Sequence, residues 1–306
     1  MIEVVEAGLF TTVQDRGRPG LERFGVTPGG VADWFSAAVG NRLLGNAPEA
    51  AVLEYAEVGP SLQFHDEAVI AITGAEPNGI RGSEVEPSWQ VRRVEARRMI
   101  VLGKLMPGLR GYLAVRGGID VSRVLGSRSL SMRGRFGGGF GRPLRQGDPL
   151  PVGELTNGGP LGRRWPLGHR LPPWGPWEVR VIAGPHSDAF PPESLERLTR
   201  TACTVTPSID RMGLRLQTPG LRLQAEEILT TPVVAGSIQV TPSGELIVLF
   251  VDHPTTGGYP VIATVIHADL PLLAQARSGD TIRFRNVDSN EAARALRRLR
   301  DWLDDR

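Results

Sequence analysis

Two apolar, β-branched runs flank the most distinctive polar segment of the chain, residues 252–260. Residues 246–251 precede this segment and residues 261–266 follow it, and such runs predict buried strands. The segment reads Asp-His-Pro-Thr-Thr-Gly-Gly-Tyr-Pro, so a carboxylate, two threonine hydroxyls and a phenol stand beside two glycines. Polar loops held between rigid strands often bind ligands, although the same pattern also fits a long hairpin turn.

Short apolar runs alternate with glycine- or proline-rich turns along the rest of the chain, which predicts many short strands and few helices. In the first half, we expect strands at residues 2–5, 9–13, 51–55, 61–64, 68–73, 99–102 and 112–115. In the second half, we expect them at residues 177–182, 204–206, 214–217, 221–223, 237–241 and 281–284. Periodicity and capping predict helices at residues 34–44, after Asp33, at 193–199, at 269–275 with Asp269 as the N-cap, and from Ser289 onward.

This pattern predicts a mainly β protein with two β-barrel-like domains. The first would comprise residues 1–155, and the second would comprise residues 177–306 and end in the terminal helix. Residues 156–176 between them are rich in proline, glycine and tryptophan. Because tryptophans are unusual in a free linker, we expect this connector to pack over the domain junction.

The composition is that of a soluble globular protein, since 41% of the 306 residues are apolar and 22% are charged. The formal net charge is +2, and arginine supplies nearly all the positive charge because Lys104 is the only lysine. Guanidinium groups bind carboxylates and phosphates, so anionic ligands fit this composition. No basic stretch carries interleaved aromatic residues, so we expect no nucleic-acid partner.

Other ionisable residues narrow the classes of protein that fit. Cys203 is the only cysteine and the five histidines show no metal-ligand spacing, so we expect neither a disulfide framework nor a metal site. Residues 186–188 read His-Ser-Asp, but adjacency in sequence is not the geometry of a hydrolytic triad. The chain starts without a signal-like segment and has no apolar run long enough to cross a bilayer, so we expect a cytoplasmic protein without membrane contact.

Candidate binding residues in the first half form two groups. Gln14, Asp15 and Arg18 follow an expected strand, with Asp33 downstream, and can orient a polar ligand. Alternatively, Asp15 pairs with a neighbouring arginine and holds its own loop. In the second group, Arg116 precedes two glycines and Arg128 lies between two serines, an arrangement that can bind a carboxylate or phosphate.

The glycine-rich residues 134–141 do not complete a nucleotide-binding loop. No helix is predicted after them, and the chain has no Gly-Lys-Ser/Thr sequence there.

A third group of candidates lies in the second half, where Arg211 follows Asp210 and Gln239 lies on an expected strand. Gln239 can bind an amide or urea-like group, and Asp252 with Tyr259 can relay a proton. Alternatively, Arg211 pairs with a carboxylate and holds two strands together.

Ten segments carry a resemblance that covers nearly the whole chain in order. They are Thr11–Arg18, Gly30–Asp33, Leu53–Glu54, Thr73–Ala75, Gly111–Gly118, Leu125–Ser129, Asp210–Gly213, Ile238–Val240, Thr255–Pro260 and Ala268–Pro271. Together they resemble the 5-oxoprolinase C-subunit family, also called KipA or allophanate hydrolase subunit 2-like proteins. This family is similar to part of the biotin-dependent carboxyltransferase region of urea carboxylase.

The resemblance implies two cyclophilin-like β domains and a place in a heteromeric enzyme. Its partners would be a KipI-like protein, the B-subunit, and a LamB/YcsF-like protein, the A-subunit. The complex would use ATP and Mg²⁺ to hydrolyse the lactam of 5-oxoproline to L-glutamate, and this chain would be active only within it. Because no ATP loop is visible here, we expect nucleotide binding in another protein of the complex or at a shared interface.

Two alternative functions remain open. In the first, the chain is the carboxyltransferase component of a urea or guanidine carboxylase, or an allophanate hydrolase-related subunit, and biotin is supplied by another protein. In the second, it is a non-catalytic regulatory module that binds a partner, as Kip-type antagonists of signalling kinases do.

Under the oxoprolinase hypothesis, Arg211, Asp252 and Tyr259 are expected to be catalytic. The expected substrate-binding residues are Gln239, Thr255, Thr256, Gly257, Gly258, Gln14, Asp15, Arg18, Asp33, Arg116 and Arg128. The chain departs from the family pattern at three places, namely residues 229–232, His253-Pro254 and Leu130. The usual residues there are Ser-Glu-Gly, an Arg-Gln pair and threonine, so these changes bear on the identity of the substrate.

Overall fold

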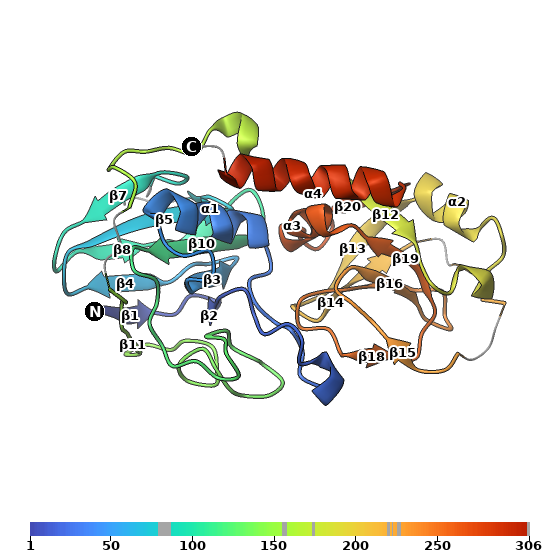
Figure 1. Ribbon diagram of the computed structural model, residues 1–306, viewed down its shortest axis with the longest axis horizontal. Coiled ribbons are helices and arrows are strands. Elements are labelled where there is room, and N and C mark those ends of the chain that lie inside the picture. The colour runs from blue at the N-terminus through green and yellow to red at the C-terminus, as the bar shows by residue number, and fades with distance from the viewer. Residues whose placement is uncertain are drawn as a thin grey trace. The chain divides into compact units, whose positions relative to one another are not determined.

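The computed structural model describes residues 1–78, 87–154, 158–172, 175–218, 221, 223–224 and 228–304. These residues form two compact units (Figure 1). The first unit comprises Met1–Arg18 and Gly29–Pro173, and the second comprises Pro19–Pro28 and Trp174–Arg306. The segment Pro19–Pro28 therefore interrupts the sequence of the first unit but belongs to the second unit. The sequence pattern does not predict this exchange.

The predicted connector is not a separate element where the structure describes it. Its described residues 158–172 group with the first unit, while residues 155–157 and 173–174 lie outside the described part of the chain. Trp165 is buried, and its indole Nε1 donates to the carbonyl of His169 at 2.8 Å. This tryptophan is therefore packed, whereas the packing of the connector over the domain junction stays a prediction.

Two antiparallel sheets enclose the core of the first unit. The four-stranded sheet has the order β11 (Pro149–Leu150), β1 (Ile2–Glu6), β4 (Ser61–Phe64) and β8 (Met99–Val101). The five-stranded sheet has the order β2 (Phe10–Gln14), β3 (Val52–Ala56), β10 (Arg110–Val115), β5 (Ala68–Gly74) and β7 (Val91–Val94). Residues from both sheets share one buried apolar cluster, so this unit is built from two open sheets where the sequence predicts a barrel.

Helix α1 (Trp34–Leu44) covers β5 and β10 in the first unit, and the sequence predicts both of its ends. Asp33 caps its first turn, because the carboxylate accepts from the Ser36 amide at 2.9 Å and the Ser36 hydroxyl at 2.6 Å. Gly45 ends it at a φ of 69°. The helix approaches the sheet closely, since a Cβ atom on Gly40 would lie 3.2 Å from Ala114 Cβ.

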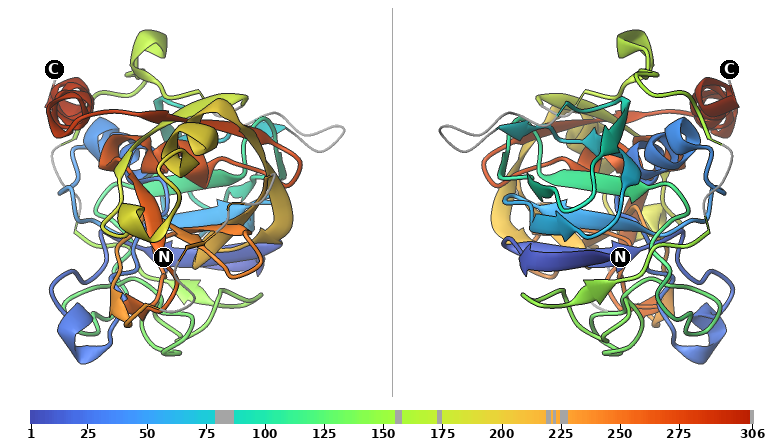
Figure 2. Two further views of the ribbon diagram at one scale, coloured as in Figure 1. Left: turned by 90° about the vertical axis from the view of Figure 1, so that its right-hand side faces the viewer. Right: turned by 90° about the vertical axis from the view of Figure 1, so that its left-hand side faces the viewer.

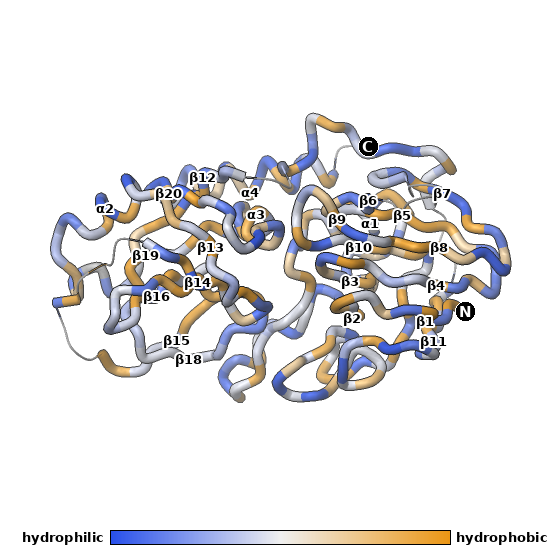
Figure 3. The backbone as a smooth tube through the Cα atoms, turned by 180° about the vertical axis from the view of Figure 1, so that it is seen from behind, coloured by the Kyte–Doolittle hydropathy of each residue, from blue (hydrophilic) through white to orange (hydrophobic). Residues whose placement is uncertain are grey.

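The second unit is a closed seven-stranded barrel (Figure 2, left view). Around the barrel the strands are β12 (Trp177–Ala183), β19 (Val261–Val265), β16 (Ser237–Val240), β17 (Leu246–Leu249), β14 (Gly213–Gln217), β13 (Ala202–Ile209) and β20 (Thr281–Asn286). A parallel pairing of β12 with β20 closes it. Many of the hydrophobic stretches lie in the strands of the two units (Figure 3). The prediction of a mainly β chain is confirmed.

The polar segment 252–260 is not the turn of a hairpin, so this interpretation of the sequence was wrong. Strands β17 and β19 each pair with opposite edges of β16 and not with each other. The segment therefore crosses over β16. Strand order depends on which long-range pairs bury the most apolar surface, and two adjacent apolar runs cannot reveal a third strand between them.

The remaining elements agree with the sequence in part. The helices of the second unit include α2 (Ser194–Arg200), α3 (Leu270–Ala274) and α4 (Ser289–Asp304). Asp269 precedes α3 as predicted, but its side chain does not cap the helix. The carboxylate instead accepts from the backbone amide and the guanidinium of Arg180, which offers charged donors. Of the strand expected at 221–223, Leu221 and Leu223 are described outside any strand, and residue 222 lies outside the described residues.

Within the described residues, none of the helices is long and apolar enough to cross a membrane. The same residues contain no group of three or more His, Cys, Asp or Glu side chains placed to hold a metal ion.

Candidate functional site

A cavity of about 430 Å³ lies on the outer face of the barrel in the second unit. Strand residues alternate between the two faces of a sheet, and Leu214, Leu216 and Val248 point into the buried core. The cavity is lined by the alternate residues of the same strands, which must point outward. Within the described part of the chain, its lining is Pro207, Ser208, Ile209, Asp210, Met212, Gly213, Arg215, Gln239, Ile247, Leu249 and Pro254.

Gln239 is the one residue of the expected site that lines this cavity. It lies on β16 and is 4% exposed. Its Nε2 donates to the Tyr259 carbonyl at 3.3 Å, which leaves Oε1 as the end of the amide that can accept. A Cβ atom on Gly257 would come within 2.4 Å of Nε2, so the backbone of the 252–260 segment presses directly on this side chain.

A small two-stranded sheet holds the 252–260 segment over the barrel. Strand β18 (Thr256–Gly257) pairs with β15 (Thr231–Pro232), and the Val233 amide donates to the Thr255 carbonyl at 3.2 Å. Val233 packs with Leu249 and Val261 in a small apolar cluster. Backbone contacts of Thr255, Thr256 and Gly257 thus hold this segment in place. Residues 229–232, one of the departures from the family pattern, contain strand β15. The preceding residues 225–227 lie outside the described part of the chain.

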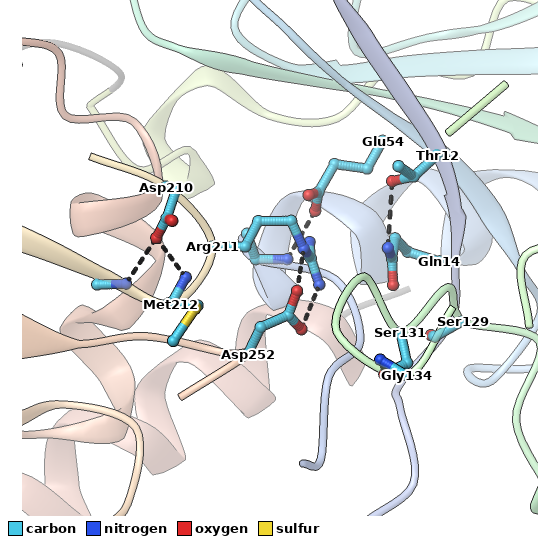
Figure 4. A network of polar contacts seen from close by, with 12 residues as sticks. Thr12, Gln14, Glu54, Ser129, Ser131, Gly134, Asp210, Arg211, Met212 and Asp252 are labelled. Atoms are coloured by element: carbon cyan, nitrogen blue, oxygen red, sulfur yellow. Dashed lines mark hydrogen bonds and ion pairs between the residues drawn. The ribbon is translucent and has the colours of Figure 1, made fainter. Parts of the chain in front are cut away.

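Arg211 and Asp252 form a buried, bidentate ion pair (Figure 4). Arg211 Nε lies 2.9 Å from Asp252 Oδ2, and Nη2 lies 3.1 Å from Oδ1. The Asp252 amide also donates to the Arg211 carbonyl at 2.8 Å. The pair joins the turn after β13 to the segment after β17, which is the structural role that the sequence left open for Arg211.

The turn that carries Arg211 is shaped by the side chain of Asp210. Its Oδ1 accepts from the Met212 amide at 2.7 Å and the Gly213 amide at 3.1 Å (Figure 4). Asp210 and Met212 line the cavity, while Arg211 between them does not. The turn therefore presents one side to the cavity and the other to the buried ion pair.

Tyr259 is 42% exposed, and its carbonyl binds Gln239. Gly258 beside it is also exposed. The residue is therefore accessible to a ligand or to a partner protein.

His253 was not among the expected site residues, although it was noted as a departure from the family pattern. It is 2% exposed, and its Nδ1 donates to the Pro254 carbonyl at 2.6 Å. Burial lowers the pKa of this histidine, while the Pro254 hydrogen bond and the charges of Glu22 and Asp252 oppose the shift. The ring is therefore held neutral beside a residue that lines the cavity.

In the first unit, Asp15 joins two loops that lie far apart in sequence. Its Oδ1 accepts from the Gly17 amide at 2.8 Å and from the hydroxyls of Ser127 and Ser129 at 2.6 Å. Its Oδ2 accepts from the Arg128 amide at 2.6 Å. The carboxylate accepts from two serine hydroxyls and two backbone amides, a role that neither the ligand-binding nor the local-pairing interpretation named.

The other expected residues of the first unit also make contacts within it. Gln14 Nε2 donates to Thr12 Oγ1 at 3.1 Å (Figure 4), and Arg18 Nη2 donates to the Ser129 carbonyl at 2.5 Å. Arg116 Nη2 donates to the Gly159 carbonyl at 2.6 Å, and Arg128 pairs with Asp120. Asp33 caps α1. Each of these side chains therefore holds a loop, a strand end or a helix end.

Beside Asp33 lies a buried network of Glu54 and Tyr112, which belong to segments of the family resemblance but not to the expected site. Glu54 Oε2 accepts from the Ala32 amide at 2.7 Å and the Tyr112 hydroxyl at 2.9 Å. The Asp33 amide donates to the Tyr112 hydroxyl at 2.7 Å. Burial is the main cause that raises the pKa of Tyr112, and the charges of Glu54 and Asp33 add to it. All six residues of β10 and four of the five residues of β3 are buried, so no alternation of buried and exposed positions marks Glu54 and Tyr112.

The glycine-rich residues 134–141 do not fit a nucleotide phosphate. The Gly134 amide donates to Ser131 Oγ, the Gly138 amide to the Arg128 carbonyl and the Gly141 amide to the Gly137 carbonyl. A phosphate-binding loop needs such amides to point toward the ligand. Leu130, another departure from the family pattern, is fully buried beneath Gly138.

Comparison with known proteins identifies the family. The profile of the carboxyltransferase domain, subdomains A and B, matches residues 24–286. The 5-oxoprolinase C-subunit of Haemophilus influenzae is 36% identical over 305 residues, which cover 99% of this chain and 97% of that protein. The protein of the same name from Escherichia coli is 34% identical over 96% of this chain and 94% of its own length. The chain belongs to the 5-oxoprolinase C-subunit family.

A solved structure extends the comparison beyond this family. The urea carboxylase of Kluyveromyces lactis superposes with a TM-score of 0.92 and is 31% identical over 99% of this chain. This chain spans only 29% of that much longer protein. The C-subunit fold is thus similar to one part of the urea carboxylase chain. Since the related 5-oxoprolinase proteins are named as components of an enzyme, they support a role within an enzyme assembly.

Proposed function

We propose that this chain is the C-subunit of a 5-oxoprolinase, an enzyme complex that opens the lactam of 5-oxoproline to L-glutamate. The observation that carries the proposal is the end-to-end match with two proteins named as 5-oxoprolinase C-subunits. A match over nearly the full length of both chains is stronger support than a shared domain, because fold alone does not determine function.

The proposed complex contains two further proteins, one KipI-like and one LamB/YcsF-like, and uses ATP with Mg²⁺. Opening an unactivated lactam needs a driving reaction, and ATP hydrolysis would supply it. The amides of Gly134, Gly138 and Gly141 already donate to acceptors of the protein, so they do not support a phosphate site in this chain. We therefore assign nucleotide binding to one of the other two proteins or to an interface with one.

Within this proposal the residues of the second unit divide into two roles. Arg211 and Asp252 position the 252–260 segment, because each carboxylate oxygen of Asp252 already accepts from Arg211. Tyr259 is accessible and is the group of this segment better placed to exchange a proton with a ligand. Gln239 would orient the amide of the substrate from the cavity.

The test is glutamate release from 5-oxoproline and ATP by this chain co-purified with the KipI-like and LamB/YcsF-like proteins. We expect activity in the full mixture and none when any one of the three proteins is omitted. Tyr259→Phe should assemble normally and lose most of the turnover. An inactive complex of folded, associated proteins would overturn the proposal, and undiminished activity of Tyr259→Phe would exclude the phenol from proton transfer.

Carboxyl transfer is a second candidate function, and the similarity to Kluyveromyces lactis urea carboxylase favours it. Lys104, the only lysine, follows Gly103, so the chain lacks the Met-Lys sequence of a biotin attachment site. Carboxybiotin would have to come from another protein. Transfer of labelled carboxylate from a carboxybiotin carrier to urea or guanidine, by a complex without oxoprolinase activity, would support this function.

A further inference from the structure

We infer that the outer cavity of the barrel binds a small ligand that carries both a carboxylate and an amide N–H. Arg215 holds the carboxylate, and Gln239 Oε1 accepts from the amide. The cavity volume of about 430 Å³ lies within the range of small-molecule sites, roughly 300–1,000 Å³. The choice of 5-oxoproline as this ligand rests on the proposed function, whereas the chemical class rests on the cavity itself.

Gln239 provides the first of the two polar contacts. The residue is buried, lines the cavity and uses Nε2 to bind the Tyr259 carbonyl. Since Nε2 is the donor in that bond, Oε1 is the end of the amide that can accept a hydrogen bond from a ligand in the cavity. The Gly257 backbone and the Tyr259 carbonyl fix the orientation of the amide, so its acceptor is positioned before a ligand arrives.

Arg215 provides the second contact. It lies on β14 with its side chain 45% exposed, and its Nη1 forms an ion pair with Glu245. A guanidinium group carries five N–H donors, and within the described part of the chain Glu245 is the partner of Arg215. Donors thus remain for a ligand carboxylate, which would compete with Glu245 for the same group.

The floor between these two groups is apolar. Ile247 and Leu249 both line the cavity from β17. Methylene groups of a compact ring would pack on them, while its carboxylate and amide reach Arg215 and Gln239. A five-membered lactam acid meets all three requirements.

The test compares binding of 5-oxoproline and 2-pyrrolidinone, which lacks the carboxylate, to the complex of three proteins without ATP. Calorimetry or equilibrium dialysis measures both affinities. Arg215→Met should weaken 5-oxoproline binding about ten- to a hundredfold, the usual contribution of a charged hydrogen bond, and leave 2-pyrrolidinone binding unchanged. Gln239→Leu should weaken both ligands. Glu245→Gln should strengthen 5-oxoproline binding, because it removes the competing carboxylate.

Arg283→Met is the matched control, since Arg283 is an exposed strand arginine of the same barrel that does not line the cavity. It should bind both ligands as the wild type does. Unchanged 5-oxoproline binding in Arg215→Met, or binding of urea but not 5-oxoproline by the wild type, would overturn the inference. If the wild-type complex is active and the Arg215→Met and Gln239→Leu variants bind 5-oxoproline as it does, the cavity is not the binding site, but the oxoprolinase function stands. If the complex binds 5-oxoproline selectively but is inactive, the cavity is the binding site and the oxoprolinase function is rejected.

Discussion

At the scale of single residues, the Gln239 amide can occupy its observed position because Gly257 has no side chain. A Cβ atom there would lie 2.4 Å from Gln239 Nε2 and 3.4 Å from Val233 Cγ1. Real side chains do not approach this closely, so Gln239 would have to leave its position. The neighbouring Gly258 has much more space, because its Cβ atom would meet only Thr230 Oγ1 at 3.8 Å.

Gly257→Ala should therefore raise the KM of the complex for 5-oxoproline about tenfold, since an overpacked site typically costs about 1–3 kcal/mol. Gly258→Ala is the control and should stay within about twofold of the wild type, because about 0.4 kcal/mol corresponds to twofold. Steady-state kinetics with assembled complexes gives both values. Equal KM values for the two variants would contradict the role assigned to Gly257.

His253 makes the stability of the second unit depend on pH. Burial lowers its pKa below the ordinary histidine value of about 6.5. Below that pH the unfolded chain binds a proton at His253 more readily than the folded chain does. The free energy of unfolding is therefore not reduced by His253 above about pH 6.5, and it falls as the solution becomes more acidic. The pKa of His267 is also lowered by burial and by Arg300, and contributes in the same direction.

His253→Asn should reduce this loss of stability, because asparagine can still donate to the Pro254 carbonyl but does not titrate. Denaturant unfolding at several pH values between about 7.5 and 5 measures the change. We expect a shallower decline of the unfolding free energy in the variant. The same slope in both proteins would show that the His253 ring is not held neutral by the fold.

At the scale of elements, the ion pair of Arg211 and Asp252 joins the turn after β13 to the segment after β17. Both side chains are about 95% buried. Removing one member of a buried pair leaves an uncompensated charge, whereas replacing both by apolar residues can be nearly neutral. The effect of Arg211 on activity must therefore be separated from its effect on folding.

Arg211→Ala should lower the unfolding free energy by about 3–5 kcal/mol, and the double variant Arg211→Met/Asp252→Leu should recover most of it. Arg200→Ala, which breaks the exposed pair with Glu196, is the control and should cost less than about 1 kcal/mol. Chemical denaturation provides the comparison. A stable Arg211→Ala variant without turnover would instead favour direct contact of Arg211 with the substrate.

At the scale of the whole molecule, the chain enters its second unit twice. Pro19–Pro28 belongs to that unit although the sequence on both sides belongs to the first. Glu22 of this segment also acts on the charge of His253. The barrel unit is therefore not contained in the C-terminal half of the sequence.

A protein made of residues 174–306 should accordingly be less stable than the same protein with residues 19–28 fused to it through a flexible Gly/Ser linker. The midpoint of urea denaturation measures the difference. A fusion with residues 19–28 in scrambled order is the control and should behave like the shorter protein. Identical midpoints for all three would show that the segment adds nothing to the barrel.

The sequence by itself determined the local elements, the mainly β class and the family. Helix α1 could be predicted at both ends because Asp33 and Gly45 act within one helical turn. The segment 255–260 identified the family because its residue order is rarely repeated by chance. These signals are local and do not depend on the path of the rest of the chain.

Only the tertiary structure decided the strand order and the contacts across long sequence separations. It inserted β16 between β17 and β19, and it brought Asp15 to Ser127 and Ser129, which are 112 and 114 residues away. It also brought Arg215, Gln239 and Ile247 to one outer face. Alternation along a strand separates its two faces but cannot say which strands become neighbours. That choice depends on how the whole chain buries its apolar surface and satisfies its buried polar groups.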